Sequence, residues 1–205
     1  FFCLLVSLTM AWGQTDNVYW DNSTGTWDDT SKWHLNSTSG PAHEPTTNDM
    51  GIMYRGDLTV DTAGEEVREL TLGWGTGNSA VLRVVEGGSL TTVGSIYMGR
   101  LASGTAYQTG GSLTVGWGLN VGETENSDGT YGYGEYNLSG GTLTTDYTSI
   151  GPGAQGVFNH TAGLHDVQED ISISGTSDSN NGTYNLSGSG ELQAKNLSMG
   201  SGSSI

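Results

Sequence analysis

Short runs of alternating apolar and polar residues recur along the chain. Examples are SLTV, GLNV, ISIS and YNLS, which are rich in β-forming residues and are bounded by glycine. A period of two residues places successive side chains on opposite faces of a strand. No stretch after Gln14 has a 3.6-residue period long enough for a useful helix. The pattern therefore predicts an all-β fold of short strands that turn at glycine.

Longer phrases repeat as well. The segments GTAYQTGGSL, GEYNLSGGTL, GVFNHTAGL and GTYNLSGSGEL occupy residues 104–113, 134–143, 156–164 and 182–192. Their final leucines, together with that of a partial copy, are Leu90, Leu113, Leu143, Leu164 and Leu192. The sequence intervals between successive leucines of this set are typical of the coils of a solenoid. We therefore expect a right-handed parallel β-helix (β-solenoid) of about six coils over residues 51–205, with Tyr136 and Leu138 pointing inward and Asn137 outward.

Each coil carries a second apolar pair just before a glycine. The pairs are Ile96 and Met98, Leu119 and Val121, Ile171 and Ile173, and Leu197 and Met199, while Ile150 holds this place with Thr148 as its partner. The number of residues from this pair to the next aromatic residue varies more than the number from the aromatic residue to the final leucine or from that leucine to the pair. Insertions are therefore expected on one edge of the stack, where they do not disturb the core.

Side-chain amides recur at one position of the repeat. Aligning the phrases on their aromatic residues places Gln108, Asn137, Asn159 and Asn185 in one column. Stacked amides can hydrogen-bond along such a column, as they do in cross-β assemblies. The alignment predicts a structural ladder at these four positions.

The beginning of the chain differs from the repeats. Residues 1–13 form an apolar run that ends in Ala11-Trp12-Gly13, which predicts the remainder of a signal peptide cleaved after Gly13. A buried N-terminal strand or helix is the alternative. Residues 14–50 contain Trp20, Trp27 and Trp33, which we expect to form a cap over the first coil. The alternative for these tryptophans is a face that stacks on carbohydrate.

Charge and cysteine content restrict the classes of binding partner and the means by which the chain can be stabilised. The formal net charge of the 205 residues is -16, which disfavours nucleic acid and anionic membranes as partners. Cys3 is the only cysteine and lies in the predicted signal segment, so the exported chain would have no disulfides. The last coil, residues 190–205, carries no polar cap, and we expect end-to-end self-association through its open strand edges.

The coils of GxYNLSGGxL type, preceded by the Trp-rich entry YWDNSTGTWDDTSKWH, resemble the secreted autotransporter-passenger-like β-solenoid proteins of bacteria. The similarity extends over roughly residues 17–205 and is greatest to the β-strand-repeat and sorting-tag proteins of planctomycetes and related groups. The resemblance implies a secreted or cell-surface protein that acts as an adhesin, as a matrix protein or, less often, as an enzyme.

Candidate catalytic groups are few. His160, His165 and Asp166 lie close together in the sequence, but His160 aligns with the inward positions of Leu138 and Leu186 and is expected inside the coil. The neighbouring carboxylates Glu65/Glu66 and Glu169/Asp170 should face opposite sides of a strand, which suits solvated charge better than an acid/base couple. The sequence thus favours a non-catalytic structural or adhesive module. A polysaccharide-acting β-helix lyase or glycoside hydrolase is the alternative.

A binding site is expected in the longest insertion, residues 122–135. It carries Tyr131 and Tyr133 among Asp128, Glu135 and other acidic residues, a combination that suits a sugar ring with an apolar face and a hydroxyl rim. A turn without a binding role is the alternative. No cofactor is expected, although the oxygen-rich loops at residues 123–129 and 177–182 leave Ca²⁺ open. Extracellular polysaccharide is the expected partner.

Overall fold

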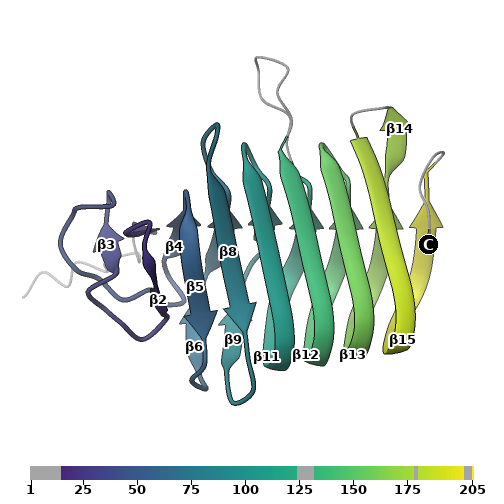
Figure 1. Ribbon diagram of the computed structural model, residues 1–205, viewed down its shortest axis with the longest axis horizontal. Helices are drawn as coiled ribbons and strands as arrows, with labels where there is room; N and C mark the ends of the chain where they lie inside the picture. The colour runs from purple at the N-terminus through teal and green to yellow at the C-terminus, as the bar shows by residue number, and fades with distance from the viewer. Residues whose placement is uncertain (1–14, 124–131, 178–179, 201–204) are drawn as a thin grey trace, which may run out of the picture.

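A computed structural model describes residues 15–123, 132–177, 180–200 and 205. Within them the chain is all-β without a helix and forms a parallel β-solenoid of about five turns, close to the six coils expected (Figure 1). The strands are β1 (Asn17–Trp20), β2 (Thr24–Thr26), β3 (Trp33–Leu35), β4 (Met50–Met53), β5 (Gly56–Val60), β6 (Glu65–Val67), β7 (Glu69–Leu72), β8 (Ser79–Val84), β9 (Ser89–Thr92), β10 (Ile96–Met98), β11 (Ser103–Val121), β12 (Tyr133–Ile150), β13 (Gln155–Ile173), β14 (Gly175–Ser177) and β15 (Asn180–Met199). The segment 1–13, assigned above to a signal peptide, lies outside the described residues.

Parallel pairing arranges the strands in three ladders, which we call the first, second and third sides. The first side consists of β2, β5, β8 and the beginnings of β11, β12, β13 and β15. The second side consists of β6, β9 and the middles of the four long strands. The third side consists of β1, β4, β7, β10 and the ends of the long strands. Each long strand therefore runs around all three sides before the next coil begins.

The core is a set of inward columns that follow the alternation in the sequence. On the first side, Leu58, Leu82, Ala106, Tyr136, Phe158 and Tyr184 are in register and buried. The Phe158 ring stacks on Tyr136 and Tyr184 at centroid distances of 4.9 and 4.7 Å. The third-side pairs predicted above also align coil by coil. Buried side chains of neighbouring coils thus stack in continuous inward columns.

The sequence alignment misplaced two residues, Tyr107 and Leu164, by one position relative to the inward columns. Tyr107 pairs with Asn137 and is 37% exposed, whereas Ala106 occupies the inward place of Tyr136. Leu164 pairs with Thr142, and the buried His165 takes the inward place of Leu143. The inward pairs 106/113, 136/143 and 158/165 are equally separated in the sequence. The inward pairs 82/90 and 184/192, which are also in register, are one residue farther apart, so neither residue type nor a constant spacing by itself sets the register.

A glycine directly follows the third-side rungs of β7, β10, β11, β12 and β15, whereas Ser174 follows that of β13. Gly99 and Gly122 have φ values of 71° and 80°. A Cβ atom on Gly99 would lie 2.3 Å from the carbonyl carbon of Tyr133, and one on Gly122 would lie 2.4 Å from the carbonyl oxygen of Gln155. Because the next coil passes so close to these left-handed turns, only glycine fits. This is the physical reason for the repeated glycine after the apolar pair.

The N-terminal tryptophans form a buried cluster. Trp20, Trp27 and Trp33 are fully buried, and their rings meet at centroid distances of 5.1 Å (Trp20 to Trp33) and 5.0 Å (Trp27 to Trp33). The indole N–H of Trp33 donates to the carbonyl oxygen of Trp27 at 3.1 Å, and β3 pairs antiparallel with β1 at the end of the third side. The indoles therefore cover the end of the stack and are not available for carbohydrate stacking.

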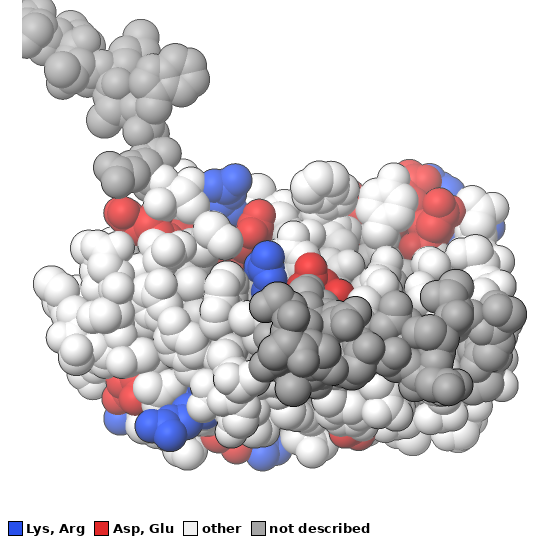
Figure 2. All heavy atoms as spheres, turned by 90° about the horizontal axis from the view of Figure 1, so that it is seen from above, with Lys and Arg blue, Asp and Glu red and all other residues white. Residues whose placement is uncertain are grey.

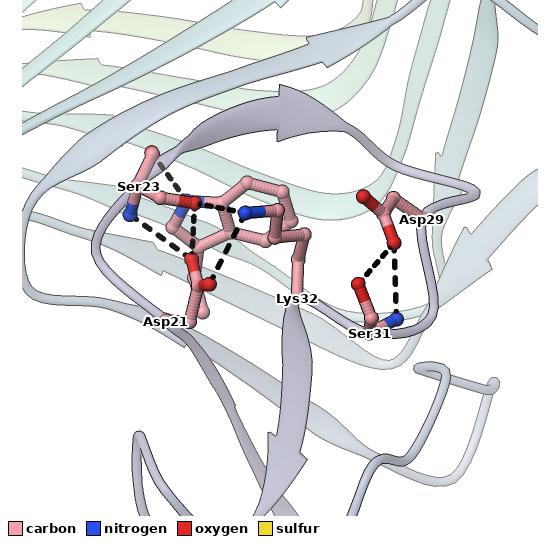
Figure 3. A network of polar contacts seen from close by, with 6 residues as sticks. Asp21, Ser23, Asp29, Ser31 and Lys32 are labelled. Atoms are coloured by element: carbon pink, nitrogen blue, oxygen red, sulfur yellow. Dashed lines mark hydrogen bonds and ion pairs between the residues drawn. The ribbon is translucent and has the colours of Figure 1, made fainter.

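The aspartates beside these tryptophans hold the turns of the cap. Asp21 accepts hydrogen bonds from the backbone N–H and hydroxyl of Ser23, and Lys32 Nζ lies 3.4 Å from its other oxygen (Figure 3). Asp29 accepts from the backbone N–H of Ser31 at 3.1 Å in the same way. Burial acts to raise the pKa of Asp21, but the Ser23 hydrogen bonds and the Lys32 charge outweigh it and lower the pKa. These carboxylates act in local structure.

The opposite end of the stack is open in the described part of the chain. The inward side chains Leu186, Leu197 and Met199 of β15 are 45%, 48% and 48% exposed, and Leu192 is only partly buried. In the earlier coils the same positions are covered by the next rung, for example Ile171 and Ile173, which are fully buried. The last rung thus presents apolar side chains that a further strand layer would cover.

Candidate functional site

Half of the loop site expected at residues 122–135 can be located. Asp128 and Tyr131 lie outside the described residues. Tyr133 begins β12, and its hydroxyl donates to Glu135 Oε2 at 3.1 Å. Burial and then the negative charge of Glu135 raise the pKa of Tyr133 to about 12. Glu135 also accepts from Asn159 Nδ2 of the next coil at 3.2 Å, so the Tyr133 hydroxyl is linked to that coil through Glu135.

The asparagines of the expected ladder share one outward column of the first side. Asn137, Asn159 and Asn185 are in register. Asn159 Nδ2 donates to Asn137 Oδ1 at 2.9 Å, and Asn185 Nδ2 donates to Asn159 Oδ1 at 2.8 Å. Asn159 thus serves as both donor and acceptor, and the two hydrogen bonds tie the three coils together.

Gln108 does not belong to that ladder. It pairs with Leu138, points inward and is fully buried. Its amide N–H donates to the carbonyl oxygen of Thr142 at 2.9 Å, and its oxygen accepts from the Tyr136 hydroxyl at 2.6 Å. The small Ala106 beside it leaves room for the Tyr136 side chain of the next coil. The expectation for Gln108 was wrong because its phrase had been aligned on Tyr107.

A chain of polar side chains crosses the interior of the last coils. His160 Nε2 lies 2.9 Å from the Gly163 carbonyl oxygen, which can only accept, so this nitrogen carries the proton. His160 Nδ1 then accepts from the Tyr184 hydroxyl at 2.9 Å, and the Tyr184 oxygen accepts from His165 Nδ1 at 3.1 Å. His160 was expected inside the coil, as found, whereas the place of His165 was missed.

The same chain continues to two threonines. His165 Nε2 accepts from the Thr148 hydroxyl at 3.1 Å, and Thr148 accepts in turn from Thr145 at 2.9 Å. Every member is satisfied with both imidazoles neutral. Burial, and then the proximity of His160, lower the pKa of His165 to about 3, and burial also lowers that of His160. This network has the properties of a structural core and not of an exposed acid/base site.

An open cleft lies on the third side, near its corner with the second side. It encloses about 270 Å³. The lining residues come from the three successive coils of β10, β11 and β12, and they are Ser95, Tyr97, Trp117, Gly118, Asn120 and Tyr147. Trp117 is 63% exposed and Tyr147 is 42% exposed. These are the most exposed aromatic side chains in the described part of the chain.

Strand register brings these residues together. Tyr97 pairs with Asn120 on the third side, and Gly118 pairs with Tyr147 at the corner. The backbone N–H of Trp117 donates to the carbonyl oxygen of Gly94 at 3.3 Å, which fixes the corner to the preceding coil. The Arg100 guanidinium lies over the rings of Tyr97 and Trp74, at 5.0 and 4.8 Å from their centroids. Trp117 therefore supplies the free aromatic face, while Tyr97 is partly covered.

Sequence reasoning did not single out this cleft. Its residues belong to three coils and lie far apart in the sequence. The local signal was GWG at residues 116–118, which interrupts the alternation between the second-side and third-side rungs. A tryptophan between two strands of a solenoid falls at a corner, where its side chain has no inward position to fill. The GWG segment can be assigned to a corner only when the register of the neighbouring strands is known.

A second cleft, of about 300 Å³, is acidic and lies near the N-terminal end. Its lining residues are Glu44, Pro45, Thr46, Thr47, Gly64, Glu65 and Glu66. Burial and then the charges of Glu44, Asp28 and Asp61 raise the pKa of Glu65, against a hydrogen bond from Thr62 that lowers it. The other adjacent carboxylates are paired: Glu169 lies 2.6 Å from Lys195 Nζ, and Asp170 accepts from Asn196 at 2.6 Å.

In the view from above, charged side chains gather at the upper and lower margins, and a smaller group of acidic and basic side chains lies nearer the middle, beside a broad area of other residues (Figure 2). Within the described ranges no group of three or more histidine, cysteine, aspartate or glutamate side chains is placed to hold a metal ion. Of the two oxygen-rich loops at which Ca²⁺ was left open, residues 124–129 of the first and residues 178 and 179 of the second lie outside the described residues. No helix in the part of the chain that the structure describes is long and apolar enough to cross a membrane.

Comparison with known proteins yields no relative. No protein-family model matches the chain, and no similar curated protein or solved structure was found.

Proposed function

We propose that the chain is a non-catalytic β-solenoid module of a secreted or cell-surface protein, with a structural or adhesive role and contacts to glycans. The observation that carries this proposal is the third-side cleft, where Trp117 and Tyr147 are held exposed on a parallel sheet. Hydration of an exposed aromatic ring is unfavourable, and such a ring contributes little to the stability of the fold. The presence of exposed rings therefore favours a binding role. The autotransporter-passenger-like character suggested by the repeats belongs to this proposal.

The scaffold suits adhesion better than catalysis. Parallel pairing of β10, β11 and β12 holds the cleft residues on rigid elements, which lowers the entropic cost of binding. A glycoside hydrolase needs two carboxyl groups that face each other across a sugar bond. The described residues that line the third-side cleft include no carboxylate. A polysaccharide bound there would be held without being cut.

The test is retention of the purified chain on insoluble polysaccharides, measured by depletion from solution. We expect retention on at least one glycan without release of new reducing ends over a long incubation. Release of reducing ends that Glu65→Gln stops would favour the alternative, a polysaccharide-acting enzyme that uses the acidic cleft. Failure to bind any glycan in a panel of neutral and acidic polysaccharides would refute the adhesive function.

A further inference from the structure

We infer that the third-side cleft selects an uncharged polysaccharide, with Trp117 as the platform on which a sugar ring stacks and Asn120 and Tyr147 as hydrogen-bond partners of its hydroxyl groups. This inference rests on the proposed function and assigns the site and the class of ligand. Three properties of the cleft support it: the free face of Trp117, the open floor at Gly118 and the lack of charge.

The exposure of Trp117 is not required by packing. The three tryptophans of the cap, Trp20, Trp27 and Trp33, are fully buried, whereas Trp117 is 63% exposed. Its neighbour Gly116 is needed by the fold, because a Cβ there would lie 2.6 Å from the Val93 carbonyl oxygen. The close passage of the two coils at Gly116 fixes the backbone from which the indole projects. A sugar ring can cover such an indole with its apolar C–H face.

Gly118 keeps the floor of the cleft open. A Cβ there would meet Asn120 Nδ2 and Ser95 Oγ at 3.5 Å, which is ordinary van der Waals contact. Its backbone is not in the left-handed region, so the fold does not demand glycine at this position. A side chain would instead occupy the space between Trp117 and Asn120. The glycine therefore leaves room for a ligand and exposes the polar groups beneath it.

The charge distribution decides the class of glycan. All six residues that line the cleft are uncharged. Two described cations on neighbouring coils are ion-paired: Lys195 Nζ lies 2.6 Å from Glu169, and Arg100 Nε lies 3.4 Å from Glu123. An acidic polysaccharide would meet the field of a chain with a net charge of -16 and no cation among the residues that line the cleft. A neutral polysaccharide is not repelled by this negative charge and needs no cation as a partner.

Asn120 and Tyr147 supply the polar partners. The Asn120 amide donates to the Gly118 carbonyl oxygen at 3.3 Å, which orients it at the floor. Tyr147 stands on the next coil, in register with Gly118, so its hydroxyl can meet a second part of the same sugar chain. A ring face and two separate polar groups on neighbouring coils together match one saccharide unit and its hydroxyl rim.

The test compares variants on insoluble neutral polysaccharides (cellulose, xylan and mannan) and on an acidic one, polygalacturonate. The wild-type chain should bind one of the neutral polysaccharides with a dissociation constant that does not change with salt, because no charge pairs form. Trp117→Ala and Gly118→Val should each weaken binding at least about tenfold, the loss of a stacking platform or of the space beside it. Tyr147→Phe should weaken it less, because only the hydroxyl is removed.

Tyr107→Ala is the matched control. Tyr107 is another exposed aromatic residue of β11, but it lies on the first side beside Arg83, away from the cleft. Its replacement should leave binding within about twofold, since it touches no part of the site. Thermal unfolding by circular dichroism should show that all variants are folded.

The outcomes separate this inference from the proposed function. Binding to a neutral polysaccharide that Trp117→Ala and Gly118→Val leave unchanged overturns the site while the adhesive function stands. Binding only to polygalacturonate overturns the ligand class. If the folded wild-type chain binds none of the four polysaccharides, the inference falls together with the function on which it rests.

Discussion

The interior histidine His165 makes a testable prediction about acid. It is fully buried, and its pKa is lowered from 6.5 to about 3, first by burial and then by His160. In the unfolded chain the imidazole returns to its ordinary pKa and takes up a proton as the pH falls below 6.5. The folded state stays unprotonated until about pH 3. Stability is therefore lost as the pH falls through the window from 6.5 to about 3.

The magnitude follows from proton linkage. Each pH unit within the window costs about 1.4 kcal/mol per histidine, so the 1.5 units between pH 6.5 and pH 5 cost about 2 kcal/mol through His165. His160 adds to the loss in the same direction, because burial lowers its pKa too. A leucine at residue 165 has no proton to gain. It also matches the coils on either side, in which Leu143 and Leu192 hold this position.

The experiment measures urea unfolding of the wild-type chain and of His165→Leu by far-ultraviolet circular dichroism at about pH 7 and pH 5. At pH 7 the substitution should cost about 1–3 kcal/mol, because Thr148 and Tyr184 lose a hydrogen-bond partner. Between the two pH values the variant should lose about 2 kcal/mol less than the wild type. An equal loss in both proteins would show that His165 is not held neutral in the core.

Three further predictions concern the stack itself. Asn159→Ala, which breaks both ladder hydrogen bonds, should lower the unfolding free energy by about 1–3 kcal/mol, and Asn185→Ala, which breaks one, by about 0.5–1.5 kcal/mol; equal effects in urea unfolding would contradict the ladder. Trp33→Ala should cost about 3–5 kcal/mol and expose the remaining cap indoles to a fluorescence quencher; unaltered quenching would exclude the cap role. The 205-residue chain should self-associate through the open rung of β15, and Leu197→Lys with Met199→Lys should shift sedimentation to monomer; association that persists would locate it elsewhere.

Much of the scaffold could be predicted because it depends on local rules. The two-residue alternation predicted inward Tyr136 and Leu138, and both are buried. The glycine after each apolar pair predicted a turn, and Gly99 and Gly122 adopt positive φ there. The buried Trp cluster was also expected. These features follow from side-chain alternation and backbone sterics, which act within a few residues of the chain.

The register between coils was predicted less well from the sequence. Aligning residue types placed Tyr107 with Tyr136 and Leu164 with Leu143, and each was displaced by one residue. In a strand, a shift of one residue exchanges the inward and outward faces. For this reason Gln108 was assigned to an outward ladder although it lies in the core, and His165 was not recognised as a core residue.

By itself, the amino-acid sequence determined the kind of fold, the turn positions and the outward place of the asparagines, because each of these depends on short-range spacing. Only the tertiary structure decided which residues meet across coils. Tyr97, Trp117 and Tyr147 come to one cleft because parallel pairing stacks residues of successive coils that are distant in the sequence. The number of residues between rungs varies, so the partner of a given residue in the next coil depends on loop lengths and packing that no local pattern encodes.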